Sequence, residues 1–169
     1  RAEQAARDWL DAAPGRSATY LATGQAWDDE MRARIARHQV DRAARVPGMQ
    51  TVEAPLQLAQ ALQAHSSPRT LVVVDCLTMW LTNWMMPMEG DAGSASKPTK
   101  TQVWSAQRAL FLEVLPRCPG PVVIVGNEIG LGVIPLGREV RQFVDALGVL
   151  NQDVAGRCGG RYDVVGSLT

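Results

Sequence analysis

His38, one of only two histidines in this chain, lies among arginines in the segment 28–42, DDEMRARIARHQVDR. Arg34 precedes it by one helical turn and Arg37 is its direct neighbour. Cationic neighbours disfavour the imidazolium and bias the ring towards the neutral form, which can attack phosphorus. The same guanidinium groups attract and orient a polyphosphate. A nucleophilic histidine at a phosphate site is therefore one interpretation, and an ordinary surface histidine is the other and the more common one.

The segment 28–42 has the pattern of a helix that would carry this imidazole. Two aspartates open the segment and favour a helix N-terminus. Met31, Ile35 and His38 recur at i, i+4 and i+7, so they share one helix face. The spacing predicts that His38 lies on the buried edge of the helix.

Polar residues follow three apolar runs that have the composition of strands. Thr23 follows the first run, Asp75 ends the run LVVVD, and Asn127 and Glu128 follow PVVIV. In an open parallel sheet the ligand lies beyond the carboxyl ends of the strands, so we expect these residues at one cleft. Asp75 resembles a Walker-B acid, which would hold Mg²⁺ directly or through water. An acid that caps the following helix is an equally good interpretation.

The segment 126–135, GNEIGLGVIP, contains three glycines, an amide, an acid and a proline directly after an apolar run. This composition predicts a shaped binding loop, whereas the alternative is a simple turn between strand and helix. The dinucleotide-binding pattern GxGxxG does not occur in the sequence.

Apolar runs that are typical of buried strands alternate with helical patterns along the chain. This alternation predicts an α/β fold with a mainly parallel sheet and helices on both faces. A mobile loop is expected over 89–101. The expected strands are 17–24, 71–75, 121–128 and 161–168, and the expected helices are 2–10, 28–42, 55–65, 76–86, 102–115 and 139–155.

Composition limits the possible classes of function. The chain has 169 residues, of which 46% are hydrophobic, and this favours one domain over residues 1–169. Lys+Arg and Asp+Glu both total 17, so no basic excess favours nucleic acid as a partner. The three cysteines lack the spacing of a disulfide framework or a zinc site, which favours a reducing cytoplasm. No apolar run approaches the roughly 20 residues that span a bilayer, so we expect no membrane span.

Four segments in this order resemble a known family: DDEMRARIARHQVDR, TVEAPLQL, LVVVDCLTMWLTN and VVIVGNEIGLGVIPLGREVRQFVDALGVLNQDVA. The family is the bifunctional adenosylcobinamide kinase / adenosylcobinamide-phosphate guanylyltransferase of cobalamin biosynthesis. The resemblance implies a RecA-like P-loop fold, usually assembled as a homotrimer. It implies adenosylcobinamide and adenosylcobinamide phosphate as substrates, GTP as the source of GMP, ATP or GTP as the phosphate donor, and Mg²⁺.

The resemblance also assigns roles to particular residues. It implies that His38 carries GMP as a covalent guanylyl-histidine, after attacking the α-phosphorus of GTP as pyrophosphate departs. Mg²⁺ and either Arg34 or Arg37 would offset the developing negative charge. The resemblance places the following residues around the nucleotide: Asp75, Thr78, Asn83, Asn127 and Glu128.

The sequence departs from the family in one motif, because GxxxxGK[ST] does not occur in it. We expect the natural gene to encode a strand and this P-loop before Arg1. Two alternatives remain open. One is a P-loop-free module that binds a nucleotide or a corrinoid without turnover, and the other is a P-loop kinase of a different substrate.

Overall fold

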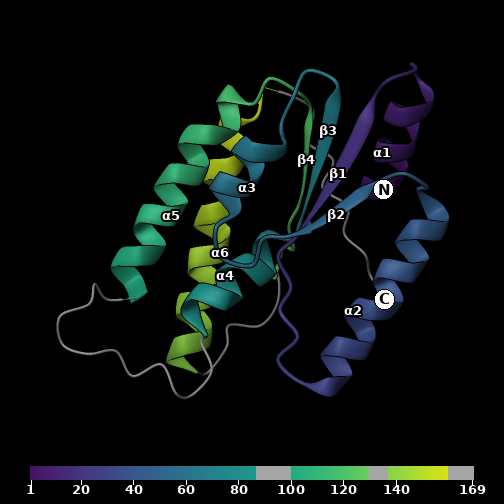
Figure 1. Ribbon diagram of the computed structural model, residues 1–169. Coiled ribbons are helices and arrows are strands. Elements are labelled where there is room, and N and C mark those ends of the chain that lie inside the picture. The colour runs from purple at the N-terminus through teal and green to yellow at the C-terminus, as the bar shows by residue number, and fades with distance from the viewer. Residues whose placement is uncertain (87–99, 130–136, 160–169) are drawn as a thin grey trace.

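The computed structural model describes residues 1–86, 100–129 and 137–159. Within these ranges, four strands pair in parallel in the order β2-β1-β3-β4. All four carboxyl ends therefore point to one edge of the sheet (Figure 1). The strands are β1 (Ser17–Ala22), β2 (Gln50–Glu53), β3 (Thr70–Asp75) and β4 (Val122–Val125).

Helices cover both faces of the sheet, and this confirms the predicted α/β architecture (Figure 1). Helix α1 packs on one face, while α3, α5 and α6 cover the other. The helices are α1 (Ala2–Asp11), α2 (Asp29–Arg45), α3 (Leu58–His65), α4 (Leu77–Met85), α5 (Lys100–Val114) and α6 (Arg138–Arg157), with a 3₁₀ turn, η1 (Leu115–Arg117), after α5.

Strand β3 separates the two parts of the hydrophobic core. Successive side chains of a strand point to opposite faces, so Leu71 and Val73 face α1 while Val72 and Val74 face the α3–α6 layer. All four are buried, as the continuous apolar run predicts. Trp80 of α4 belongs to the larger cluster, in which the centroid of its ring lies 4.9 Å from the centroid of the Trp104 ring. Its indole also donates to a backbone carbonyl at 2.9 Å, so Trp80 is a core residue.

The sequence patterns missed the edge strand β2. It has four residues, and Val52 is the only apolar one, so it carries no alternation that a pattern could detect. The strand predicted over 161–168, residues 89–99 of the predicted loop and residues 130–135 of the glycine-rich segment lie outside the described residues. Among the residues described, no helix is long and apolar enough to cross a membrane.

Candidate active site

Side chains join the C-terminal ends of β1 and β3. These ends lie at the edge of the sheet where all four strands end, which we call the carboxyl edge. Tyr20 donates its phenol hydrogen to a carboxylate oxygen of Asp75. The hydroxyl of Thr23, which is fully buried, accepts from the backbone N–H of Cys76 and donates to its carbonyl, both at 2.8 Å. This double contact fixes the chain where it leaves β3.

Asp75 is half-buried and is not a helix cap. The N-cap of α4 is Cys76, and no side chain donates or accepts a capping hydrogen bond there. Tyr20 holds one carboxylate oxygen, and within the described ranges the other oxygen has no hydrogen-bond partner. The capping interpretation of Asp75 is therefore wrong, and the carboxylate keeps an oxygen for a ligand.

The described ranges contain no group of three or more His, Cys, Asp or Glu residues that could hold a metal ion alone. Mg²⁺ is usually held by one or two carboxylates together with water and substrate phosphates. A lone carboxylate such as Asp75 fits an ion that arrives with a nucleotide, and it does not fit a resident metal in an all-protein cage.

Two further predicted site residues meet across the same edge. The backbone N–H of Asn127 donates to the hydroxyl of Thr78 at 3.3 Å, which joins the end of β4 to α4. Asn151 of α6 donates to the carbonyl of Asn127 at 3.1 Å. A side chain at Gly126 would meet the Asn151 amide oxygen at 3.0 Å, so the chain passes close to α6 here. Glu128 is exposed and makes no hydrogen bond or ion pair with another described residue.

Asn83 is buried and ties loops together. Its amide donates to the carbonyl of Thr23 at 2.7 Å and to that of Pro55 at 2.9 Å. Both amide hydrogens are thus used on the backbone that follows β1 and β2. Asn83 therefore holds in place the backbone segments that follow β1 and β2. A direct contact between Asn83 and a nucleotide stays a prediction.

Helix α2 begins as predicted, but His38 lies differently. The Asp28 carboxylate accepts from the backbone N–H of Met31 at 2.6 Å, a regular N-cap. His38 is exposed, so the prediction that it lies on a buried edge is wrong. The reason is that the face of α2 that carries Met31 and Ile35 is only half-covered, and the helix meets the sheet chiefly near its C-terminal end, at Arg42.

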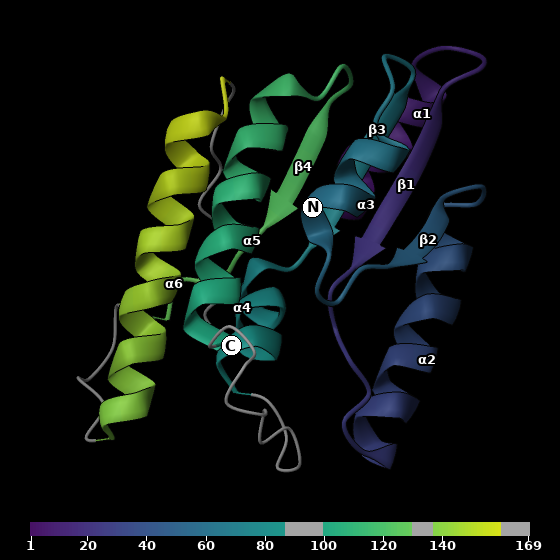
Figure 2. The same cartoon turned by 60° about the vertical axis from the view of Figure 1, so that its left-hand side comes forward.

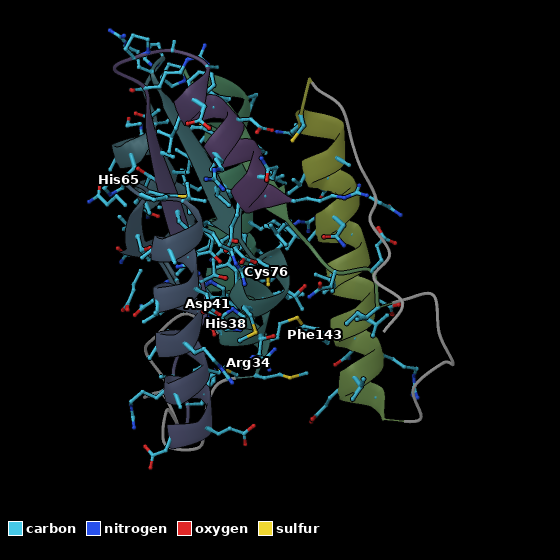
Figure 3. The ribbon with its side chains drawn as sticks, turned by 90° about the vertical axis from the view of Figure 1, so that its right-hand side faces the viewer. Arg34, His38, Asp41, His65, Cys76 and Phe143 are labelled. Atoms are coloured by element: carbon cyan, nitrogen blue, oxygen red, sulfur yellow. The ribbon has the colours of Figure 1, made fainter. Side chains whose placement is uncertain are left out.

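Arg34 and Arg37 are exposed beside His38, and none of these three side chains makes an ion pair or hydrogen bond with another described residue. Figure 2 shows α2 and α4 on either side of the chain that leaves β1, both beyond the carboxyl ends of the strands. Figure 3 shows His38 and Arg34 farther from the strands than Cys76, the residue that directly follows β3. The structure therefore puts the cationic helix and Asp75 at one edge, without a direct contact between them.

Burial controls the protonation of the groups next to Asp75. It raises the pKa of the Tyr20 phenol, and the charge and hydrogen bond of Asp75 raise it further, while Arg42 opposes the shift without reversing it. Burial also raises the pKa of the Cys76 thiol. A thiol that keeps its proton is a poor nucleophile, so Cys76 is not suited to nucleophilic attack.

Sequence patterns missed Tyr20 and the burial of Arg42. The guanidinium carbon of Arg42 lies 3.4 Å from the centre of the Tyr20 ring. One signal was available: Tyr20 stands between Ala18 and Ala22 on the same face of β1, and two small neighbours leave room for a long side chain from another element.

The sequence matches the model of one protein family, described as cobinamide kinase / cobinamide phosphate guanyltransferase, over residues 2–168. It is 40% identical over 149 residues to the bifunctional adenosylcobalamin biosynthesis protein CobP of Pseudomonas aeruginosa, which covers 88% of this chain and 78% of that protein. It is 33% identical over 155 residues to the bifunctional adenosylcobalamin biosynthesis protein CobU of Escherichia coli, with 88% and 82% covered. The CobU protein of Salmonella typhimurium is also 33% identical, over 142 residues, with 80% and 75% covered.

Proposed function

This chain belongs to the cobinamide kinase / cobinamide phosphate guanyltransferase family, and we propose that it is a bifunctional enzyme of cobalamin biosynthesis. It phosphorylates adenosylcobinamide and then transfers GMP from GTP to adenosylcobinamide phosphate, which gives adenosylcobinamide-GDP. Assembly as a homotrimer and a cytoplasmic location are parts of the same proposal. The first rests on the family alone, and the second rests on the spacing of the three cysteines.

The observation that carries the proposal is the pairing of two features at the carboxyl edge. One is the half-buried Asp75, whose second carboxylate oxygen has no partner among the described residues. The other is the exposed side of α2, with His38, Arg34 and Arg37. Guanidinium groups that form no ion pair within the described protein are available for phosphate oxygens, which they bind strongly and with defined geometry.

In the proposed transfer, a ring nitrogen of His38 attacks the α-phosphorus of GTP, a P–N bond forms, and the bond to pyrophosphate breaks. Arg34 and Arg37 offset the negative charge that develops on the phosphoryl oxygens. A phosphate oxygen of adenosylcobinamide phosphate then attacks the same phosphorus, and the P–N bond breaks. Neutral imidazole is an effective nucleophile and, once protonated, a competent leaving group. His38 can therefore serve in both the formation and the breakdown of the covalent intermediate.

Asp75 is the residue that would hold Mg²⁺ in this proposal, together with the phosphates of the nucleotide. When bound, the ion offsets phosphate charge and helps pyrophosphate to leave. Thr78, Asn127 and Glu128 line the same edge and belong to the proposed nucleotide site. Asn83 supports that site through the backbone that it holds.

Two labelled forms of GTP test the proposal. The protein is incubated with Mg²⁺ and adenosylcobinamide, and with either γ-labelled or α-labelled GTP. A bifunctional enzyme transfers the γ-label to adenosylcobinamide, which gives labelled adenosylcobinamide phosphate. It transfers the α-label to adenosylcobinamide phosphate, which gives labelled adenosylcobinamide-GDP. Transfer of the γ-label to another acceptor alone would favour a different kinase. GTP binding without transfer of either label would favour a binding module.

A further inference from the structure

Arg42 is an unusual residue to bury. Within α2, all of whose residues are described, it is the only buried one, and its side chain is 8% exposed. A charged side chain loses hydration when it is buried, so it needs strong partners. Its Nη1 donates to the Thr51 hydroxyl at 3.3 Å, its Nε lies 4.0 Å from a Glu3 carboxylate oxygen, and its guanidinium covers the Tyr20 ring. Its Nε makes no hydrogen bond within the described residues, so the burial is only partly compensated.

Arg42 lies between the helix position of His38 and the residues that hold Asp75. Arg42 follows His38 by four residues, so the two side chains share one side of α2 and are one turn apart. Tyr20, on which the guanidinium lies, donates to Asp75. Arg42 and Tyr20 thus connect α2, which carries His38, to Asp75, the proposed ligand of Mg²⁺.

We propose that Arg42 is a positioning residue for the transfer reaction: its contact with Tyr20 fixes α2 on the sheet and sets His38 at the distance from Asp75 that in-line attack requires. This inference rests on the proposed function. A nucleophile on a helix that is exposed along most of its length needs such an anchor, because a misplacement of about 1 Å can cost on the order of 100-fold in rate.

A cation suits this anchor better than an aliphatic side chain. A methionine could cover the ring, but it would form no directional contact. The guanidinium is held by the face of the ring and by the Thr51 hydroxyl from two directions, and this limits both sliding and rotation of α2.

The test measures the rate of covalent GMP attachment at saturating GTP, the GTP concentration for half-maximal rate, and the melting temperature. The variants are Arg42→Met, Arg42→Lys and Tyr20→Leu. The matched control is Arg45→Met, because Arg45 lies on the same helix and pairs with the same Glu3 but does not touch Tyr20. All rates are compared well below the lowest melting temperature, so that every variant is folded.

Arg42→Met is expected to lower the rate at saturating GTP by at least about tenfold, with a smaller change in the half-saturating concentration, because binding at Asp75 persists while attack is misplaced. Arg42→Lys should restore part of the rate, since an ammonium still binds the ring. Tyr20→Leu should lower the rate at saturating GTP as Arg42→Met does, and it should also raise the half-saturating concentration because it removes the hydrogen bond to Asp75. Arg45→Met should stay within about twofold of the wild type.

A folded Arg42→Met or Tyr20→Leu protein that attaches GMP at the wild-type rate would overturn the inference. An equal loss of rate in Arg45→Met would overturn it as well, because general loosening of α2 would then explain the effect. A wild-type protein that forms no covalent GMP adduct would instead contradict the proposed function, so the two failures are distinct.

Discussion

The phenol of Tyr20 donates a hydrogen bond to a carboxylate oxygen of Asp75, although the two residues belong to different strands and stand 55 positions apart. The parallel pairing of β1 with β3 brings them together, because Ala22 is aligned with Asp75 in the register. The contact orients the carboxylate and leaves one of its oxygens for a ligand. Tyr20 also carries the Arg42 guanidinium on its ring, so it links α2 to the carboxyl edge.

Tyr20 should make stability fall at alkaline pH. Its pKa in the folded protein is raised above the ordinary value of 10.0, so the folded protein keeps a proton that the unfolded chain loses. The stabilisation is complete below about pH 10 and is lost as the pH rises beyond it. Between about pH 10 and pH 11, the free energy of unfolding of the wild type should fall by up to about 1.4 kcal/mol more than that of Tyr20→Phe. Urea titrations at each pH measure both slopes, and equal slopes would show that Tyr20 is not responsible.

Asp75→Asn should separate nucleotide binding from stability. The amide keeps an acceptor for the Tyr20 phenol but removes the charge that attracts Mg²⁺. We expect the Mg²⁺-dependent affinity for GTP to fall by about tenfold or more, with a melting temperature within about 2 °C of the wild type. Asp145→Asn, on the exposed side of α6, is the matched control and should change neither quantity. A variant that loses stability and keeps its affinity would assign Asp75 a structural role.

Thr23→Val should destabilise the carboxyl edge without touching the proposed chemistry. The Thr23 hydroxyl is the acceptor for the backbone N–H of Cys76, whereas the Cys76 carbonyl also accepts from the N–H of Trp80. The variant therefore leaves the Cys76 N–H unpaired, which costs about 1–3 kcal/mol. The melting temperature should therefore fall by at least about 2 °C. Thr82→Val is the control, because the Thr82 hydroxyl contacts only the Thr78 carbonyl within its own helix. Similar shifts in both variants would mean that the Thr23 contacts contribute little.

The strongest elements of the fold could be predicted from the sequence, and the contacts between them could not. β3 was predictable because a continuous apolar run needs cover on both faces of a sheet. β2 was missed because a four-residue edge strand has too few side chains to show a period. The contact between Tyr20 and Asp75 depends on strand order and register, which a single sequence does not encode in any local pattern.

His38 shows the limit of helical periodicity. The spacing with Met31 and Ile35 identifies a helix face, but it does not say whether another element covers that face. In the structure α2 meets the sheet through a buried arginine near its C-terminal end, and His38 stays exposed. The sequence suggested phosphate chemistry from the types of residues on α2, and only the structure could show how that helix is held.

Covalent labelling is the most direct test of the proposal that His38 carries GMP. The protein is incubated with α-labelled GTP and Mg²⁺, denatured and separated, and the wild type is compared with His38→Ala and with His65→Ala, the other histidine of the chain. A phosphorus–nitrogen bond is acid-labile and base-stable, so treatment with acid and with base identifies the linkage. We expect the wild type and His65→Ala to carry such a label and His38→Ala to carry none. A label that persists in folded His38→Ala and disappears in His65→Ala would show that His38 is not the residue that carries GMP.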